Sequence, residues 1–403
     1  MLRVLHVIET IAPREGGPPR VVASLAAAQR RLGIDAHILC GDGAELPDHV
    51  RYWQAHVPGF PADHVRTVAC RSRNLVARAM ALRDWLKTNL RGFEVVHIHQ
   101  LWRLVPSLAG LACRRLSVPY LIAPHTSLSP WALAQKKPKK QLARWLAWNR
   151  IFASASAFHA LSEIEATEIR EFAGVGPSVF VVSNGVSLTE FSDVTLEDPS
   201  RTIADPLVRA GAIQPYVLFF ARLHTMKGPD LLLEAFASIA FDHRGLQLVF
   251  AGPDFGMLRG LRSRAAQLKL IDRVHFLGLV SGSDRTWLLR NALCLGQPSR
   301  DEGFSLSILE AMASRCPVVI SDRCKFPEVG RSGAGIVVPL SIPDLAAALA
   351  RYVIDPARRV ADGSAARRLI EKSYTWEIVA GQARSMYEKS TKLGVLSPSC
   401  EVQ

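Results

Sequence analysis

Short apolar segments alternate with helical patterns along this chain, and no other feature of the sequence constrains the fold as strongly. Strands that alternate with helices form parallel sheets whose faces are covered by the helices. We therefore expect an α/β protein with two series of strands. The first series is expected at residues 4–8, 34–40, 95–99, 119–123, 157–160 and 179–182. The second is expected at residues 217–221, 246–252, 273–277, 292–297, 317–321 and 336–338.

Residues 187–212 separate the two series. They are rich in Asp, Ser, Thr and Pro and poor in large apolar side chains, as is typical of a linker. The 403 residues, of which 49% are hydrophobic, suffice for two domains with separate cores. Ligands of doubly wound sheets bind beyond the carboxyl ends of the strands. We expect two such domains facing each other across a cleft that holds the substrates.

Several motifs are absent from the sequence. It has no Gly-x-Gly-x-x-Gly and no Gly-Lys dipeptide, which argues against a dinucleotide cofactor and a Walker A loop. It also has no Asp-x-Asp pair to hold a metal ion on a diphosphate, so we expect no metal and no cofactor. The seven cysteines lack any Cys-x-x-Cys spacing and are expected to be reduced. Without a signal-peptide pattern or an apolar run of about 18 residues, we expect a cytoplasmic protein.

The net charge of +13 is unevenly distributed, because residues 95–162 contain no Asp or Glu. Within this stretch, residues 131–150 combine lysines and arginines with Trp131, Trp145 and Trp148. Lys140 and Arg144 are one helical turn apart, as in an interfacial amphipathic helix. We interpret the segment as a contact with an anionic membrane surface, at the inner face of the cell membrane. A solvated basic face is the alternative, and no nucleic-acid motif accompanies the charge.

The stretch ARLHTMKGPD places two cations directly after an expected strand and before an expected helix. A helix N-terminus that follows a strand is a favourable place for phosphate, because its free amides and its dipole both attract an anion. Arg222 and Lys227 would add charge to such a site. They could equally be solvated loop residues.

Two carboxylates, Glu302 and Glu310, lie eight positions apart in DEGFSLSILEA. Glu302 falls in a loop and Glu310 inside a helix that Ser305 or Ser307 could cap, so that amides of residues 303–307 point toward the same place. A sugar nucleotide offers hydroxyls at both ends and phosphates between them, which suits two separated carboxylates with cations in the middle. A glycosidase pair, with carboxylates about 5–9.5 Å apart, and a purely structural role are the alternatives.

Together these motifs resemble the retaining nucleotide-sugar glycosyltransferases of family four, which have the two-domain GT-B fold. Glu302-Gly303-Phe304 through Glu310 is similar to the Glu-x7-Glu signature of that family, and Arg222 with Lys227 to its Arg/Lys pair. The resemblance extends to three further stretches, namely the glycine loop at Gly16-Gly17, SNGV at residues 183–186 and AGPDFG at residues 251–256.

The resemblance implies a role for each matching residue. Glu310 would bind the ribose, Glu302 the transferred sugar, and Arg222 and Lys227 the diphosphate. Amides of Gly303, Phe304 and Ser305 would complete the cradle. Gly16, Gly17, Asn184 and His125 would contribute from the first domain, whereas His97 and His99 are expected to be mainly structural.

The resemblance also implies the domain organisation. Residues 1–190 would form the acceptor-binding domain and residues 205–375 the nucleotide-sugar domain. A C-terminal helix at about residues 376–392, beginning near Trp376, would cross back onto the first domain.

We therefore expect a metal-independent hexosyltransferase that moves sugar from a nucleoside diphosphate donor to a glycan or lipid-linked hydroxyl, with retention of configuration. Such an enzyme would serve polysaccharide biosynthesis. A GT-B nucleotide-sugar epimerase and a non-catalytic glycan-binding protein are the alternatives. Ser305 stands where many members have Gly, and Thr126-Ser127 replaces a frequent Gly-Met, so the donor (a UDP-sugar, GDP-mannose or an ADP-sugar) and the acceptor both stay open.

Overall fold

The computed structural model describes residues 1–68, 75–174, 178–191 and 215–395, and the chain divides into two compact units. The first unit comprises Met1–Gly185 and Trp376–Gln403, and the second comprises Val186–Thr375. Most of the expected linker lies outside the described residues, as do Cys70 and Cys400. The other five cysteines are buried and unpaired.

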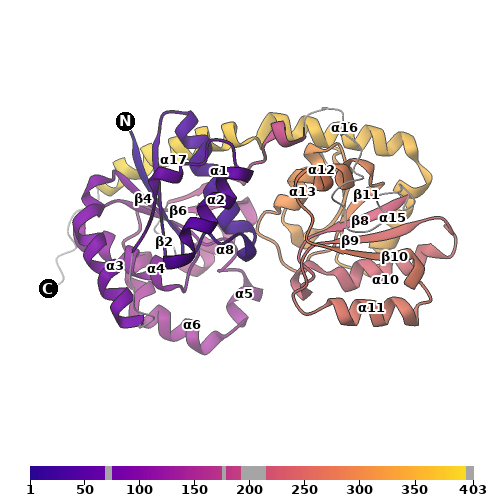
Figure 1. Ribbon diagram of the computed structural model, residues 1–403, viewed down its shortest axis with the longest axis horizontal. Coiled ribbons are helices and arrows are strands. Elements are labelled where there is room, and N and C mark those ends of the chain that lie inside the picture. The colour runs from indigo at the N-terminus through magenta and orange to yellow at the C-terminus, as the bar shows by residue number, and fades with distance from the viewer. Residues whose placement is uncertain (69–74, 175–177, 192–214, 396–403) are drawn as a thin grey trace. The chain divides into compact units, whose positions relative to one another are not determined.

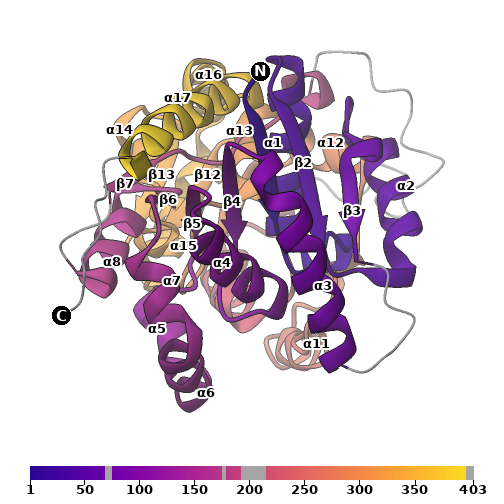
Figure 2. The same cartoon turned by 90° about the vertical axis from the view of Figure 1, so that its left-hand side faces the viewer.

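The first unit is built on a parallel sheet with the strand order β3-β2-β1-β4-β5-β6-β7. Figure 2 shows β3 and β7 at its two edges. The sequence analysis missed β3, because Val-Arg-Thr is too short to show a period and lies at an edge. The strands are β1 Arg3–Val7, β2 Asp35–Cys40, β3 Val65–Thr67, β4 Val95–His99, β5 Tyr120–Ala123, β6 Ala157–Ala160 and β7 Ser178–Val181.

Helices cover both faces of this sheet, because the central strands are buried on both sides. One core cluster packs under α1 and α2, and another under α3, α4, α7 and α8. The C-terminal helix α17 packs against α1, as expected (Figure 1). The bounds are α1 Gly17–Arg31, α2 Leu46–His56, α3 Leu75–Asn89, α4 Leu104–Leu116, α7 Asn149–Ala153, α8 Glu163–Ala173 and α17 Trp376–Val395.

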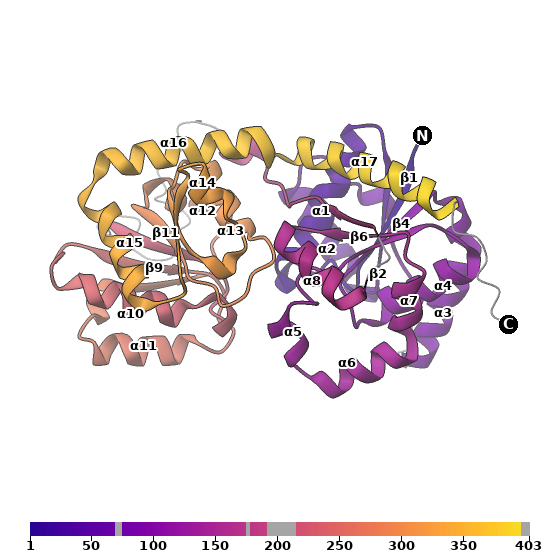
Figure 3. The same ribbon diagram turned by 180° about the vertical axis from the view of Figure 1, so that it is seen from behind.

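The second unit has its own parallel sheet, in the order β10-β9-β8-β11-β12-β13, and its own core (Figure 3). The strands are β8 Tyr216–Phe220, β9 Gln247–Ala251, β10 Val274–Gly278, β11 Cys294–Gln297, β12 Val318–Ser321 and β13 Gly335–Val338. The helices are α10 Pro229–Ala240, α11 Leu258–Gln267, α12 Gly282–Asn291, α13 Leu306–Ala313, α14 Glu328–Arg331, α15 Ile342–Ile354 and α16 Pro356–Ser373.

Two glycines hold the loops of the second unit close to neighbouring backbone. A Cβ on Gly252 would lie 1.9 Å from the carbonyl oxygen of Ala221, and one on Gly228 would lie 2.0 Å from that of Pro298. Both glycines have positive φ. Only glycine permits this approach, so the segments on either side of Arg222 and Lys227 are fixed by close backbone contact.

Candidate active site

Lys227 and Glu302 form an ion pair within the second unit. Lys227 ends a single 3-10 turn, Thr225–Lys227, between β8 and α10, while Glu302 lies in the loop between β11 and α13. Strands β8 and β11 are hydrogen-bonded neighbours, so their carboxyl ends bring the two loops together. The side chains keep only 12% and 10% of their surface exposed, so the two charges neutralise each other away from bulk water.

A network of hydroxyl and amide groups surrounds the Glu302 carboxylate. Gln297 Nε2 donates to Glu302 Oε2 at 3.1 Å and to Ser305 Oγ at 2.9 Å, and Ser299 Oγ reaches the same carboxylate oxygen at 3.4 Å. Ser305 occupies the N-cap position of α13, but its side chain makes no cap hydrogen bond and bonds Gln297 instead. Ser305 is thus the N-cap residue, as expected, but its side chain does not cap the helix, and Ser307, the other candidate, lies inside α13.

The loop before α13 is fastened at several points. The amide of Arg300 donates to the carbonyl of Met226 at 2.7 Å, and its guanidinium forms a bidentate pair with Asp230 at 2.8 and 2.6 Å. Asp301 pairs with Lys325 at 3.1 Å, and both side chains are buried. These contacts tie the Glu302 loop to the Lys227 loop and to the turn after β12, which fixes the position of the ion pair.

Glu310 is buried in the middle of α13. Its Oε1 accepts a hydrogen bond from Arg285 Nη1 at 3.0 Å. Arg285 belongs to α12, also pairs with Glu190, and lies 5.1 Å from the centre of the Phe191 ring. Sequence reasoning missed Arg285, because nothing in the composition of α12 separates it from a solvated arginine.

The other predicted residues of the second unit lie in the same two loops, after β8 and after β11. Arg222 follows β8 directly, and its guanidinium lies 5.1 Å from the centre of the Phe255 ring. Gly303 lies between Glu302 and Phe304 in the loop, and the buried Phe304 ring packs 4.6 Å from Phe326. The structure thus joins Lys227, Glu302 and Ser305 in one contact network.

In the first unit, Gly16 and Gly17 form the start of α1. Gly16 is the N-cap and has a φ of 86°, a conformation that disfavours other residues. The preceding loop is fixed by Asp42, which pairs with Thr10 Oγ1 and accepts from the amide of Ile11 at 2.9 Å. The first turn of α1 therefore has a defined place after β1, although Pro18 and Pro19 carry no N–H and the amide of Gly16 donates to the carbonyl of Pro13 at 3.2 Å.

His125 follows β5, is half-buried, and has a left-handed φ of 49°. Its Nε2 lies 2.9 Å from His99 Nδ1. The carboxylate of Glu165, a residue that sequence reasoning missed, accepts from the amides of Thr126 and Leu161, both at 2.7 Å. A left-handed φ at a residue other than glycine is strained, and such strain is concentrated at functional sites, where it holds a side chain in a required orientation.

Asn184 is buried just after β7, and Gly185 ends the first unit. A Cβ on Gly185 would meet the Trp376 ring at 2.8 Å, so the residue beside Asn184 must be small for α17 to begin there. Gly16, Gly17, His125 and Asn184 thus all lie on loops of the first unit.

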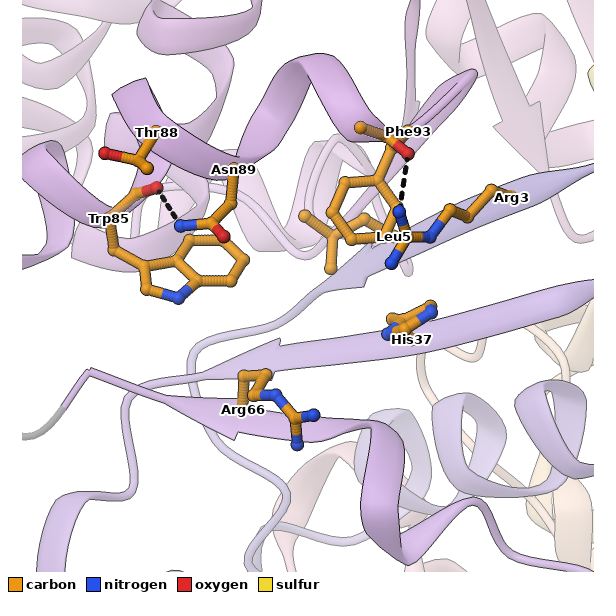
Figure 4. Close-up of a pocket in the computed structure, with 9 residues that line it drawn as sticks. Arg3, Leu5, His37, Arg66, Trp85, Thr88, Asn89 and Phe93 are labelled. Carbon is orange, nitrogen blue, oxygen red and sulfur yellow. Dashed lines mark hydrogen bonds between the residues drawn. The ribbon is translucent and has the colours of Figure 1, made fainter.

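A hollow of about 390 Å³ lies elsewhere in the first unit, at the amino ends of β1 and β2. Its lining includes Arg3, His37, Arg66, Trp85 and Phe93 (Figure 4). No predicted site residue lines it. Because the carboxyl ends of the strands are the ligand-binding edge of such sheets, we do not assign it to the site.

Segment 131–150 comprises α5 Pro130–Ala134, α6 Lys137–Ala143 and a π-helical turn, Arg144–Trp148. Together these elements make an arm at the edge of the first unit (Figures 1 and 3). Trp145, Leu142 and Leu146 are 73%, 57% and 54% exposed. Trp148 is buried, so its expected place on the membrane-facing side is wrong: it packs in the core beside Trp102 and Phe152.

The fold and the loop residues together define a class. Two separate doubly wound parallel sheets and a C-terminal helix that returns to the first of them are the features of the GT-B fold. Comparison with known proteins identifies the family within this class. Residues 209–376 match the family described as "Glycosyl transferases group 1", and residues 16–185 match the "Glycosyl transferase 4-like domain".

Individual relatives agree with these matches. The chain is 27% identical to a D-inositol 3-phosphate glycosyltransferase of Actinosynnema mirum, over 93% of this chain and 94% of that protein. It is 25% identical to a GDP-mannose:cellobiosyl-diphosphopolyprenol alpha-mannosyltransferase of Komagataeibacter xylinus, over 96% and 93%. The crystal structure of Anabaena HepE with UDP and glucose shares the fold, with a TM-score of 0.76, 19% identity and coverage of 96% and 100%.

The chain belongs to the group 1 glycosyltransferases of family four, which are retaining hexosyltransferases with the GT-B fold. It transfers sugar from a nucleotide sugar. The fold class and the family expected from the sequence are thereby confirmed.

Proposed function

We propose that this enzyme transfers a hexose from a nucleoside diphosphate sugar to a hydroxyl of a glycan or a lipid-linked glycan, with retention of anomeric configuration and without a metal ion. The buried Lys227–Glu302 ion pair carries the proposal. It places a cation and a carboxylate together beside the N-terminus of α13, where a phosphate and a sugar hydroxyl of one donor would be bound side by side.

The second unit, residues 205–375, would bind the donor. Glu310 would accept hydrogen bonds from the ribose hydroxyls, and Glu302 would hold the transferred sugar. Arg222 and Lys227 would neutralise the diphosphate, together with amides of Gly303, Phe304 and Ser305. The ion pair supports this arrangement, because Lys227 can exchange the Glu302 carboxylate for phosphate without first being desolvated.

The first unit, residues 1–190 with the helix at about 376–392, would bind the acceptor. Gly16, Gly17 and Asn184 would contribute to substrate binding, and His125 would contact the sugar near the reacting carbon. The strained loop that carries His125 supports this assignment, since Glu165 fixes its backbone.

The chemical step would depend on the leaving group. Attack on the same face as the departing diphosphate retains the configuration, and the leaving phosphate itself would take the proton of the attacking hydroxyl. Negative charge grows on that phosphate as the glycosidic bond breaks. Lys227 and Arg222 would stabilise this charge, which is the largest contribution that fixed electrostatics can make.

The acceptor is proposed to be lipid-linked, at the inner face of the cell membrane. The Komagataeibacter relative is named for a diphosphopolyprenol-linked acceptor. In this chain, the arm at residues 131–150 exposes Trp145, Leu142 and Leu146 beside several lysines. Apolar side chains next to cations suit an anionic lipid surface. Among the described residues, no helix is both long and apolar enough to cross a membrane.

A panel experiment tests the proposal. Thermal shift against nucleoside diphosphates and their sugars selects the donor, since a ligand at 100 times its Kd stabilises by about 2.7 kcal/mol. The selected donor is then incubated with diphosphopolyprenol-linked and free oligosaccharides, and NMR gives the anomeric configuration of the product. Transfer only in the presence of acceptor, with retention, is expected. Conversion of the donor to an epimer without acceptor would instead identify an epimerase.

A further inference from the structure

A continuous chain of hydrogen bonds crosses the core of the first unit. It joins imidazoles of β1, β4 and β6 to side chains of α1 and α17, and it ends at the loop after β5. Its members in order are Val182, His159, His97, Tyr387, Gln29, His6, His99 and His125, with successive contacts of 2.6, 3.1, 2.9, 2.9, 2.7, 2.9 and 2.9 Å.

The imidazoles of this chain are neutral. Burial lowers the pKa of His6 and of His159 to about 4, that of His125 to about 3, and those of His97 and His99 well below the ordinary value. A neutral imidazole carries one N–H donor and one lone pair, so each ring must donate on one side and accept on the other. The direction of one hydrogen bond therefore fixes the direction of the next.

The carbonyl of Val182 sets that direction, because it can only accept. His159 must therefore donate from Nε2, which leaves Nδ1 to accept from His97 Nε2. His97 Nδ1 is then a lone pair, and the Tyr387 hydroxyl donates to it. Tyr387 lies on α17, so the C-terminal helix supplies a required member of the chain.

The second half of the chain follows from Tyr387. Since its proton is committed to His97, its oxygen accepts from Gln29 Nε2, and this orients the amide so that Oε1 faces His6. His6 donates from Nε2, and its Nδ1 accepts from His99 Nε2. His99 Nδ1 in turn accepts from His125 Nε2.

We propose that this chain fixes His125 in the tautomer with its proton on Nε2, so that Nδ1 is a hydrogen-bond acceptor for a hydroxyl of the bound sugar. The opposite tautomer would place two lone pairs against each other inside the core. The role toward sugar rests on the proposed function, whereas the tautomer does not. Tyr387 and Gln29 are positioning residues, which act on the site through the imidazoles.

Metal binding is the other chemistry that these imidazoles suggest. Ring nitrogens of His6, His97 and His99 lie within 4.8 Å of one another, a spacing that a metal ion could use. Both ring nitrogens of each already take part in the chain of hydrogen bonds, which accounts for their closeness. We therefore assign the cluster to positioning.

NMR of the ring nitrogens in the full chain labelled with ¹⁵N-histidine tests the proposal. At pH 7 the His125 signals, assigned by their loss in His125→Gln, should show protonated Nε2 and unprotonated Nδ1 with no averaging. Tyr387→Phe removes the donor to His97 and the acceptor for Gln29, so His125 should become a mixture of tautomers. Gln29→Met should do the same.

Tyr352→Phe is the matched control, because it removes a hydroxyl from the core of the second unit, where Tyr352 donates to Asp362. It should leave the His125 signals unchanged. With the donor selected above, Tyr387→Phe should lower kcat at least tenfold and leave the Kd of the nucleoside diphosphate unaltered. The proposal is overturned if wild-type His125 is protonated on Nδ1, or if its ring-nitrogen signals stay the same in both Tyr387→Phe and Gln29→Met. The NMR measurement needs no substrate, so it tests the tautomer of His125 separately from the proposed transferase activity.

Discussion

The ammonium of Lys227 and the carboxylate of Glu302 are paired in the second unit, from loops that follow neighbouring strands. Each neutralises a charge that would otherwise be costly to bury. In the proposed reaction the two exchange this contact for the phosphate and the sugar of one donor. Their substitutions should therefore affect nucleoside diphosphate binding in opposite directions.

Lys227→Met should weaken nucleoside diphosphate binding and lower kcat about 10²- to 10³-fold, because it removes a cation that faces growing charge in the transition state. Glu302→Gln should tighten binding of the nucleoside diphosphate, since Lys227 no longer has a competing carboxylate, and should weaken the additional binding due to the sugar. Calorimetric Kd values and single-turnover rates measure these effects. Lys372→Ala, an exposed lysine of α16, is the control. Tighter nucleotide binding by Lys227→Met would contradict the assignment.

Glu310→Gln should mainly weaken donor binding, by about 1.5–3 kcal/mol for a charged hydrogen bond, with a smaller change in the single-turnover rate. The ribose contact changes little as the glycosidic bond breaks. Since Arg285 also bonds this carboxylate, the melting temperature of each variant must be measured alongside. Intact donor affinity with no chemistry would favour a paired-carboxylate hydrolase over the ribose assignment.

Chelation should leave activity intact. Arg222, Lys227 and the amides before α13 would supply the charge that a divalent ion supplies in other enzymes. Initial rates are compared in an excess of EDTA and with added Mg²⁺ or Mn²⁺. Loss of activity in EDTA that either ion restores would refute metal independence.

Replacing Lys136, Lys137, Lys139 and Lys140 with Gln should release the protein from vesicles rich in anionic lipid, since each lysine contributes at most about 1 kcal/mol near such a surface. Turnover of a water-soluble acceptor should persist. Trp145→Ala should weaken vesicle binding as well, whereas substitution of the buried Trp148 would test only folding. Sedimentation with vesicles measures binding, and unchanged sedimentation of the four-lysine variant would assign these residues to a solvated face.

Stability should fall as the pH drops below about 6.5. The folded state lowers the pKa of five core histidines, with His6 and His159 at about 4 and His125 at about 3, so the unfolded chain binds more protons between these values and 6.5. Stability is therefore fully present above pH 6.5 and is lost toward pH 4, by about 1.4 kcal/mol per pH unit for each such proton.

Urea unfolding between pH 5 and 7.5, chosen to span roughly the pKa of unfolded histidine, measures this slope. His159→Gln should lower the slope of unfolding free energy against pH by the contribution of about one proton. A flat profile would show that the core histidines are not held neutral.

The positions of the strands and of the loops that follow them were predictable from the sequence, because an apolar run between helical patterns has one stable solution in a parallel sheet. Glu302, Arg222 and Lys227 stood out because each lies in a loop that follows a strand, and Glu310 because it lies eight positions after Glu302 in the next helix. The edge strand β3 escaped prediction, since three residues at an edge carry no period.

Only the tertiary structure decided how these groups are paired. Arg285 reaches Glu310 across 25 positions of sequence, and Glu302 accepts from Gln297, which also bonds the Ser305 side chain. Tyr387 completes a chain of histidines although 290 positions separate it from His97. Sequence patterns report which face of an element is buried, because burial follows the local period of a helix or strand. Hydrogen bonds between elements depend on which strands become neighbours, and that order is set by the packing of the whole sheet.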